Sequence, residues 1–599
     1  MAEQGNPENL FATAMQDAFP GPALGMTPAA ETPGAGRPAQ NWILDPVQDA
    51  LFIIAAPLLV LAVALLGFGM LGAESAVALI ILVHMVMTVA HHLPTFIRIY
   101  GDVDLFHRFK WTFLLGPLLP LAFSAGVLGY MAAKDVPVEN FLYLFILLAL
   151  WDPYHFLMQH YGFMRIYDRH NVAPRRLAAR MDLLLCAAWF IFIMASSSEW
   201  LPGILEDLYR TVGTSLALVV PPGAIHALTT CSGLLAGAAT LAYVAYLLWC
   251  RRQGYFISAA KLALFAITFC VMYLTYVPNT LMQGLAPGWT FKAGFAAIGI
   301  VHMTQYLAIV WRYNRSIAAR PGRARAGLFN RLHLRGGLLA AAGYVALCLA
   351  YGETLTGTHG GRWLMSIVMA LGFTSTLLHY YFDGFIWKLR HQQNRENLAP
   401  AEPAGLSGAT TQNALSWWSS GGGPGAGAVL LRHTLYFVAP MALLTAGAVA
   451  LWQGPGSNYV GRMALAQRLY QQGQEEQARS EAQLALDSME QQLPLARRFA
   501  ELQPNAAHQA ALAYLVYNHS RYHNLLLPTL AGDRLDQERL ASYRTDLGEA
   551  IGELSSAIAS GGSLAHPGAE KLTAEEGRHA LEKWQAELAR MQGTPAPQS

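Results

Sequence analysis

One apolar stretch of the chain, residues 150–169, carries polar side chains where a membrane helix would ordinarily carry apolar ones. Asp152, His155, Gln159 and His160 all lie within it. Polar and ionisable groups inside a membrane helix are unfavourable unless they face the interior of a bundle and find partners there. These four residues are therefore candidates for a buried site.

Three further apolar stretches carry histidine in the same way: residues 76–98 (His84, His91 and His92), 293–312 (His302) and 363–388 (His379, with Asp383 four residues later). Residues seven apart on a helix share one face, so we expect His84 and His91 on the same side of their helix. His92 should point about 100° further round.

The histidines also lie at similar heights in their predicted helices. The first basic residue after each stretch marks the membrane surface: Arg98, Arg165, Arg312 and Lys388. At 1.5 Å of rise per residue, the histidines lie roughly 8–21 Å inside that surface, most of them near 15 Å. All four helices run in the same direction in the predicted topology, so we expect the imidazoles to share one slab of the bilayer.

Neutral imidazole is a good ligand for iron, copper, zinc and nickel. A single histidine in a membrane helix more often makes an interhelical hydrogen bond, so the argument depends on several converging. We predict a metal site whose ligands come from His84, His91, His92, His155, His160, His302 and His379.

Four other polar residues are predicted to take part in the chemistry of this site: Asp152, Gln159, Tyr306 and Asp383. The two carboxylates would bind the metal or orient an imidazole N–H group, and the phenol could donate a proton. The expected cofactor is one or two iron ions, with copper, zinc or haem as alternatives.

The composition predicts an all-α membrane protein. The 599 residues are 54% hydrophobic and 13% charged, about half the charged fraction of an average soluble domain. Stretches of about 20 apolar residues can cross a bilayer, and they occur at 51–71, 76–98, 112–133, 141–166, 181–200, 224–249, 260–277, 293–312, 337–352, 363–388 and 433–452. We therefore expect a bundle of about eleven membrane helices over residues 41–452, with the lipid bilayer as its partner. The net charge of +2 and the lack of a basic face do not suggest nucleic-acid binding.

The basic residues between these stretches predict the orientation. With the N-terminus in the cytoplasm, the inside segments carry 23 Lys and Arg residues and the outside segments carry four. Cytoplasmic segments are enriched in basic residues. We expect a protein of the bacterial inner-membrane type, with its N-terminus in the cytoplasm and its C-terminal region in the periplasm.

Three segments differ from the membrane bundle. Residues 1–40, rich in Gly, Pro and Ala, are expected to be a disordered tail, and residues 396–430 a flexible cytoplasmic loop. Residues 459–599 are polar with a helical pattern, which predicts a soluble helical domain. Tyr470, Gly473, Ala478 and Ala485 lie at positions that resemble a tetratricopeptide repeat. That resemblance implies a protein partner for this domain.

Two histidine patterns resemble those of known membrane enzymes. His84, His91 and His92 form HxxxxxxHH, and His155 and His160 form HxxxxH. They loosely resemble the histidine boxes of integral-membrane iron oxygenases and desaturases, which bind two irons near the cytoplasmic ends of their helices. Isolated histidines on several spans are also similar to bacterial carotene-cleaving dioxygenases. Either resemblance implies iron chemistry on a hydrophobic substrate.

These observations lead to three hypotheses for the function. The first is a membrane-embedded, metal-dependent oxidoreductase or oxygenase that acts on a lipid-like small molecule, with iron as the expected metal. The second is a transporter coupled to protons or metal ions, because histidines and carboxylates can form an ion path. The third is a haem or copper protein for electron transfer. A metal analysis and a visible spectrum would separate them.

Overall fold

A computed structural model of the chain describes residues 40–133, 143–197, 199–212, 216–221, 223–318, 337–356, 361–386, 459–561, 564–566 and 569–592, with separate positions between 427 and 446. Two predicted features lie almost entirely outside these residues: the N-terminal tail 1–40 and the loop 396–430. Of the last apolar stretch, 433–452, only separate helical positions between 434 and 446 are described.

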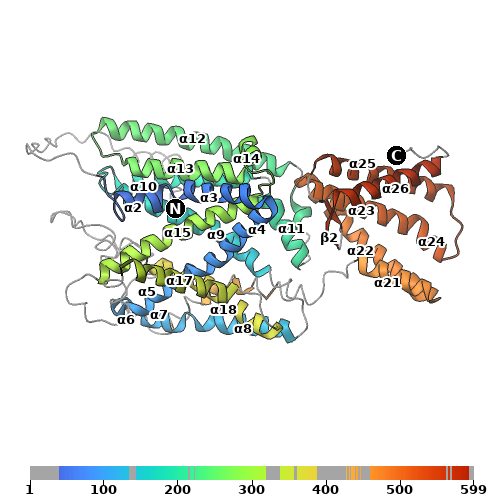
Figure 1. The fold of residues 1–599 in the computed structure, drawn as a ribbon, viewed down its shortest axis with the longest axis horizontal. Coiled ribbons are helices and arrows are strands. Elements are labelled where there is room, and N and C mark those ends of the chain that lie inside the picture. The colour runs from blue at the N-terminus through green and yellow to red at the C-terminus, as the bar shows by residue number, and fades with distance from the viewer. Residues whose placement is uncertain are drawn as a thin grey trace, which may run out of the picture. The chain divides into compact units, whose positions relative to one another are not determined.

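Helices account for nearly all of the described structure before residue 400 (Figure 1). In chain order they are α2 (Pro46–Asp49), η1 (Ala50–Ile54), α3 (Ala56–Leu71), α4 (Ala73–Ala90), α5 (His92–Gly101), α6 (Val103–Arg108), α7 (Lys110–Leu115), α8 (Leu118–Ala133), α9 (Tyr143–Tyr167), α10 (Arg175–Ser196), α11 (Trp200–Val212), η3 (Leu216–Val219), α12 (Ala224–Arg252), α13 (Ala259–Tyr276), α14 (Thr280–Leu285), α15 (Phe291–Ala318), α17 (Gly337–Thr356) and α18 (Arg362–Ile386).

Eight helical segments in the described part are long and apolar enough to cross a membrane: Ala73–Gly101, Lys110–Ala133, Arg175–Ser196, Ala224–Arg252, Ala259–Tyr276, Phe291–Ser316, Leu339–Thr356 and Arg362–Asp383. A ninth is counted if Pro46–Ile54 and Ala56–Leu71, bent by 54°, form one broken span. Helix α9 covers the fourth predicted stretch, but it is not among the eight, and its polar residues lower its apolar character. The prediction of long apolar helices is confirmed, whereas the number eleven stays a prediction.

Much of this apolar surface is exposed. In the most apolar part of Ala73–Gly101, whose mean hydropathy is 2.0, only 17% of the residues are buried inside the protein. Water would not tolerate so much contiguous apolar surface on a single chain. A lipid environment does, because a helix satisfies its own backbone hydrogen bonds. The helices are therefore compatible with an integral membrane protein.

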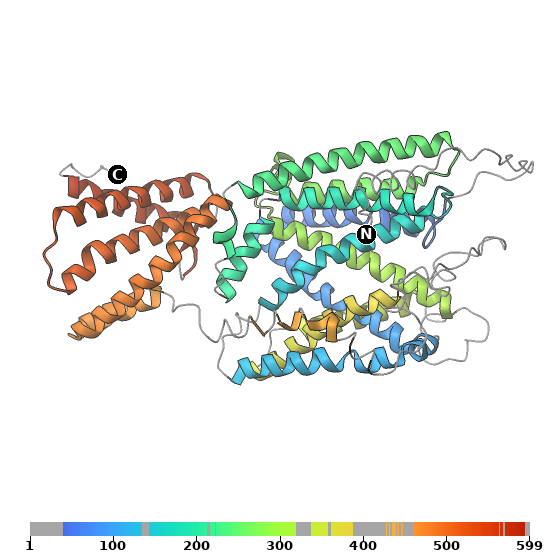
Figure 2. The ribbon, with the colours of Figure 1, turned by 180° about the vertical axis from the view of Figure 1, so that it is seen from behind.

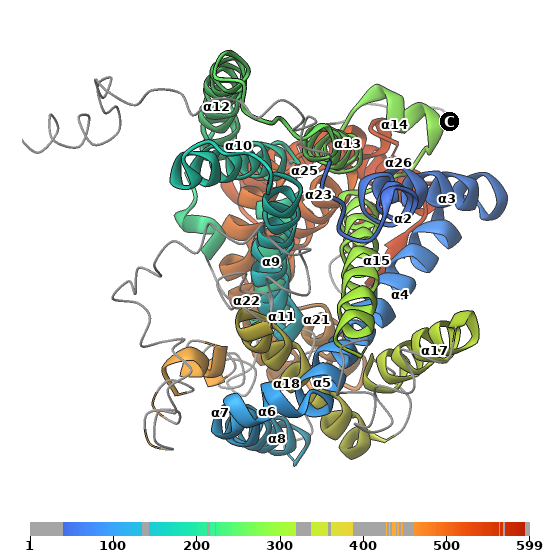
Figure 3. The same cartoon turned by 90° about the vertical axis from the view of Figure 1, so that its left-hand side faces the viewer.

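Helices α9 and α15 run through the middle of the bundle. Figures 1 and 3 both place α10, α12 and α13 on one side of these two helices, and α8 and α18 on the other. The view from behind in Figure 2 shows α8 (light blue) alongside α18 (yellow), which are in contact. Helix α4 contacts both α15 and α17. Four helices that carry the predicted site residues, α4, α9, α15 and α18, thus meet in the interior.

Glycine allows two of these helix pairs to approach closely. A Cβ atom at Gly352 of α17 would lie 2.2 Å from the Val86 carbonyl oxygen of α4, and one at Gly294 of α15 would lie 2.2 Å from the Thr275 carbonyl oxygen of α13. Small residues at helix interfaces are a common basis of packing in membranes, where the hydrophobic effect between helices is weak. These contacts fix α4 and α15, which carry histidines, against their neighbours.

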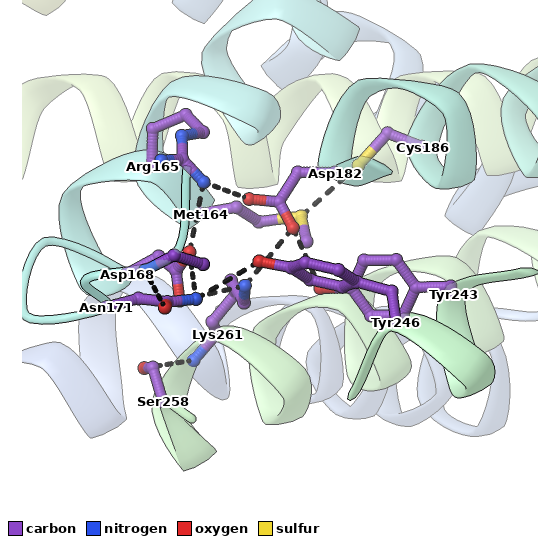
Figure 4. Close-up of polar contacts among 11 residues, drawn as sticks. Met164, Arg165, Asp168, Asn171, Asp182, Cys186, Tyr243, Tyr246, Ser258 and Lys261 are labelled. Atoms are coloured by element: carbon purple, nitrogen blue, oxygen red, sulfur yellow. Dashed lines mark hydrogen bonds and ion pairs between the residues drawn. The ribbon is translucent and has the colours of Figure 1, made fainter. Parts of the chain in front are cut away.

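Buried charges join α9, α10 and α13 near one end of the bundle (Figure 4). Lys261 Nζ of α13 lies 2.9 Å from Asp168 Oδ1 and 3.1 Å from Asp182 Oδ1. Arg165 of α9 donates hydrogen bonds to the same two carboxylates, and the Tyr243 hydroxyl of α12 donates to Asp182 at 2.8 Å. The two cations and two anions balance. We call these four charged residues the ion-pair cluster.

The described C-terminal helices are α21 (Tyr459–Gln471), α22 (Glu475–Leu502), α23 (Ala506–Arg521), η5 (Tyr522–Leu526), α24 (Leu527–Leu530), α25 (Gln537–Ala559) and α26 (Ala574–Gln592). The strands β1 (Leu564–His566) and β2 (Ala569–Leu572) form a small antiparallel pair between α25 and α26. Buried side chains of these helices form two apolar clusters of their own.

Three of the four residues at positions that resemble a tetratricopeptide repeat have the burial or backbone conformation that the repeat requires. Ala478 and Ala485 are fully buried on α22. Gly473, with φ of 74°, makes the turn between α21 and α22, and this left-handed conformation favours glycine. Tyr470 is 54% exposed, although the repeat would use an aromatic residue there for packing. Membership of that family, and the solubility of this region, stay predictions.

Candidate metal centre

Five histidines and one aspartate come together in the interior of the bundle. They form three overlapping groups: His91, His155 and His302; His91, His92 and His379; and His155, His379 and Asp383. Within each group, one potential ligand atom of each residue lies within 4.8 Å of the others. We call these six residues the histidine cluster. It could hold a metal ion.

The imidazole rings of the cluster are in close contact. The ring centroids of His91 and His379 are 4.5 Å apart, those of His92 and His379 are 4.6 Å apart, and those of His155 and His302 are 5.0 Å apart. All five are buried or nearly so, and His155 is the most exposed at 14% of its side chain. Rings this close can direct nitrogen atoms of several imidazoles toward one ion.

The Nε2 atoms of all five histidines are buried and have no hydrogen-bond partner among the described residues. The Nδ1 atom of His302 is also buried and has no hydrogen-bond partner among the described residues. Buried polar atoms are nearly always hydrogen-bonded, so each exception needs an explanation. Five unpartnered nitrogens in one place are explained if the lone pairs bind a cation.

A break between α4 and α5 brings two consecutive histidines into the cluster. The sequence predicted one continuous helix, with His92 turned away from His91. Instead α4 ends at Ala90, and α5 begins at His92. Pro94 explains the break, because it has no N–H group to donate to the Ala90 carbonyl oxygen. Both imidazoles at this break lie against the His379 ring.

The other ring nitrogen of three histidines is held by a neighbour. His91 Nδ1 lies 3.2 Å from the Met87 carbonyl oxygen, which can only accept, so this nitrogen carries the proton. His92 Nδ1 lies 3.1 Å from Ser375 Oγ, which in turn is 2.9 Å from the Tyr351 hydroxyl. Contacts of this kind fix the tautomer of metal-binding histidines and leave Nε2 free for the ion. Sequence reasoning did not identify Ser375 or Tyr351.

Thr95 is a third residue that sequence reasoning missed. Its hydroxyl lies 2.9 Å from His379 Nδ1 and 3.3 Å from Asp383 Oδ1, and it also bonds to the Tyr306 hydroxyl. Tyr306 donates to Asp383 Oδ1 at 2.9 Å. One oxygen of the Asp383 carboxylate is therefore occupied by hydroxyl groups. The other, Oδ2, faces His155 Nε2 at 3.8 Å and His379 Nε2 at 3.6 Å.

These separations suit a common ion. Ligand bonds of about 2.1 Å place neighbouring donor atoms roughly 3.0–4.2 Å apart, depending on the angle between them. The distances from Asp383 Oδ2 to the two imidazole nitrogens, 3.8 and 3.6 Å, fall in this range. Two histidines and one carboxylate are the ligand set of many non-haem iron oxygenases.

Five predicted site residues lie outside the cluster, and one of them, Tyr306, bonds to Asp383. His84 packs against Gly299 of α15, where a Cβ atom would meet its ring at 2.3 Å. The His160 ring lies against Phe269, 5.1 Å between centroids, and its ring nitrogens have no partner among the described residues. Gln159 donates to the His302 carbonyl oxygen at 3.0 Å, and Asp152 accepts from the Tyr380 hydroxyl at 3.1 Å.

No protein-family model matches the chain, and searches of curated proteins and of solved structures found no match. The argument for a function therefore depends on the geometry of the histidine cluster and on the chemistry of its residues.

Proposed function

We propose that the chain is an integral-membrane, metal-dependent oxidoreductase that binds one or two iron ions in the histidine cluster. The observation that carries this proposal is the convergence of unpartnered Nε2 atoms with one carboxylate oxygen. Iron in such a ligand set, with coordination positions left open, activates O₂ for the oxidation of organic substrates.

The roles of the protein residues follow from their contacts. His155, His379 and Asp383 would hold one ion, and His91, His92 and His302 would complete that site or hold a second ion. Tyr306 and Thr95 hold Asp383 Oδ1, so that Oδ2 faces the histidines. The Tyr306 hydroxyl is the nearest phenolic proton to the carboxylate, which makes it a candidate proton donor.

The surroundings favour a hydrophobic substrate. The cluster lies among helices whose side chains are mostly apolar, and Phe156, Phe190 and Ile298 are buried close to His302. An apolar site inside a membrane bundle is reached from the bilayer more readily than from water. It also excludes water from the reaction. We therefore propose a lipid-like small molecule as the substrate.

Metal analysis tests this proposal. We expect the protein purified in detergent to contain about one or two irons per chain by mass spectrometry, with no Soret band in the visible spectrum. A Soret band would support the haem alternative. Absence of tightly bound metal would contradict the proposal and favour an ion-coupled transporter.

Histidine variants locate the site. We expect His155→Ala and His302→Ala to lose most of the metal, because each removes a member of the cluster. His160→Ala is the matched control, since His160 is buried on the same helix as His155 but packs against Phe269. The three variants should unfold at similar temperatures. Equal metal content in all three would exclude the histidine cluster as the binding site.

A further inference from the structure

Two sulfur atoms meet in the interior of the bundle, outside the histidine cluster. The Sγ atom of Cys186 on α10 lies 3.2 Å from the Sδ atom of Met164 on α9 (Figure 4). Both side chains are completely buried. A thiol is only a weak hydrogen-bond donor and a thioether a weak acceptor. Both are, however, good ligands for soft metal ions once the thiol has lost its proton.

A buried imidazole lies one helical turn from this pair of sulfur atoms. His160 precedes Met164 by four residues on α9, and residues at this spacing are neighbours on one helix face. His160 is only 1% exposed, and neither of its ring nitrogens has a hydrogen-bond partner among the described residues. An unpaired polar group in an apolar interior is unfavourable. An ion bound to the lone pair of the imidazole would satisfy one of the two nitrogens.

The packing of α9 against α10 brings His160 and the two sulfur atoms together. Phe156, four residues before His160, contacts Phe190 of α10, with 6.5 Å between centroids. Met164, four residues after His160, contacts Cys186, which lies four residues before Phe190. His160 therefore lies between two contacts with the same helix. Long side chains on a helix lean toward its N-terminus, over the residue four positions earlier. The thioether of Met164 thus leans toward His160.

The charges nearby favour a monovalent ion. Asp182, one turn before Cys186 on α10, belongs to the ion-pair cluster, in which two cations already balance two carboxylates. When Cu⁺ replaces the proton of the Cys186 thiol, the copper thiolate carries no net charge, and the proton passes to solvent. A divalent ion would leave an unbalanced positive charge in an apolar interior. Thiolate and thioether ligands also select Cu(I) by their softness.

We propose that His160, Met164 and Cys186 form a binding site for Cu(I), separate from the histidine cluster. The Phe156 ring packs against both His160 and His302, at 6.4 and 6.1 Å between centroids. The two sites are therefore neighbours, but they share no ligand. The copper site does not depend on the proposed function, because it requires no iron in the histidine cluster.

Cu(I) binding to the full-length protein in detergent tests the site. The protein is loaded with Cu(I) under anaerobic, reducing conditions, and the copper is then withdrawn with bicinchoninate, a chelator whose Cu(I) complex is coloured. Loss of a mere supporting contact lowers metal affinity by up to about 100-fold. We expect Cys186→Ser, Met164→Leu and His160→Ala, which each remove a ligand, to weaken the binding of one Cu(I) by at least this factor.

Two substitutions elsewhere in the bundle are the matched controls. Cys348→Ser changes a buried free cysteine on α17, and Met131→Leu changes a buried methionine on α8. Both residues belong to other apolar clusters, so these variants should bind Cu(I) as the parent protein does. Thermal unfolding of all five variants checks that each is folded.

X-ray absorption at the copper edge tests the ligands without any substitution. We expect the copper in the parent protein to have both sulfur and nitrogen neighbours, and the nitrogen to be lost in His160→Ala. Copper surrounded by nitrogen and oxygen alone would place the ion in the histidine cluster and overturn the inference. Unchanged Cu(I) affinity in Cys186→Ser would also overturn it.

Iron, measured in the same samples, keeps the two proposals apart. His160→Ala should lose Cu(I) binding and keep the iron of the histidine cluster, whereas His155→Ala should do the reverse. Protein that binds Cu(I) at the sulfur atoms but holds no iron keeps the copper site and loses the oxidoreductase.

Discussion

At the scale of residues, three of the five imidazoles of the cluster use their two nitrogens differently. Where the structure gives Nδ1 a partner, that partner is a carbonyl or hydroxyl oxygen, as for His91, His92 and His379. In all five histidines Nε2 is left without one among the described residues. A histidine that only linked helices would use both nitrogens or leave one in contact with water. The arrangement is typical of metal-binding histidines whose tautomer is fixed by a hydrogen bond to the nitrogen that does not bind the metal.

Thr95 is the residue on which we expect this control of the tautomer to depend most. Thr95→Val keeps the shape of the side chain but removes the hydroxyl that contacts His379, Tyr306 and Asp383. Loss of such a supporting contact lowers metal affinity by about 10–100-fold. Equilibrium dialysis against a metal buffer would measure it.

Thr304→Val is the control for this experiment. Thr304 is a threonine of α15, two residues from His302, but its hydroxyl donates to the Ile300 carbonyl oxygen of its own helix. We expect the control to bind metal as the parent protein does. If both variants bind equally well, Thr95 has only a packing role.

The sequence could indicate the histidines but not their supporting residues. Histidine is rare in membrane helices, so its recurrence at one depth in several helices indicates a shared site. Threonine and serine are common there and usually bond to their own helix, as Thr304 and Thr376 do. Nothing in the sequence distinguishes Thr95 and Ser375 from them, because their partners lie about 280 residues away. Likewise, spacing alone did not exclude His84 and His160, since rotation of a helix about its axis depends on its neighbours.

At the scale of elements, the ion-pair cluster holds α9 in place relative to α10 and α13 (Figure 4). The sequence placed Arg165 at a basic membrane surface and gave it no partner. In the structure, Lys261 is only 1% exposed and contacts two buried carboxylates. Burial raises the pKa of the Asp168 carboxyl, although Lys261 and Arg165 oppose this effect. The bundle can therefore bury these charges only when the lysine, the arginine and both carboxylates are all present.

We therefore expect Lys261→Met to destabilise the bundle by about 3–5 kcal/mol, because it leaves buried negative charge without a partner. Thermal unfolding in detergent would measure the loss. Adding Asp168→Asn should recover part of it, since the substitution removes one unpaired charge. Lys110→Met, at an exposed lysine, should have little effect. An unchanged unfolding temperature for Lys261→Met would mean that water or lipid headgroups reach the cluster.

At the scale of the whole molecule, the predicted eleven spans and the described helices agree in position over most of the bundle. They differ where a helix is broken or polar: η1 and α3 are bent by 54°, α4 and α5 separate at His91, and α9 is too polar to count as a span on composition alone. Each of these differences from the predicted spans has a physical cause. Proline interrupts the backbone hydrogen bonds, and the site residues themselves reduce the apolar character of the helix that carries them.

The orientation predicted from the distribution of basic residues can be tested directly. We expect a cysteine introduced near the N-terminus, in a variant lacking the five native cysteines, to react with a membrane-impermeant maleimide only after cell lysis. A cysteine on the exposed face of α25, for example at Glu538, should react in spheroplasts. The opposite pattern would invert the topology. Labelling of both sites from outside would mean an even number of spans instead of the predicted odd number.

The long sequence separation within the histidine cluster has a consequence for biosynthesis. His92 and its partner Ser375 are 283 residues apart, and His379 and Asp383 follow on the same late helix. While the ribosome is still translating the segments between them, the nascent chain has the earlier imidazoles but lacks His379 and Asp383. If the histidine cluster binds iron as proposed, loading of the metal would therefore follow the insertion of α18.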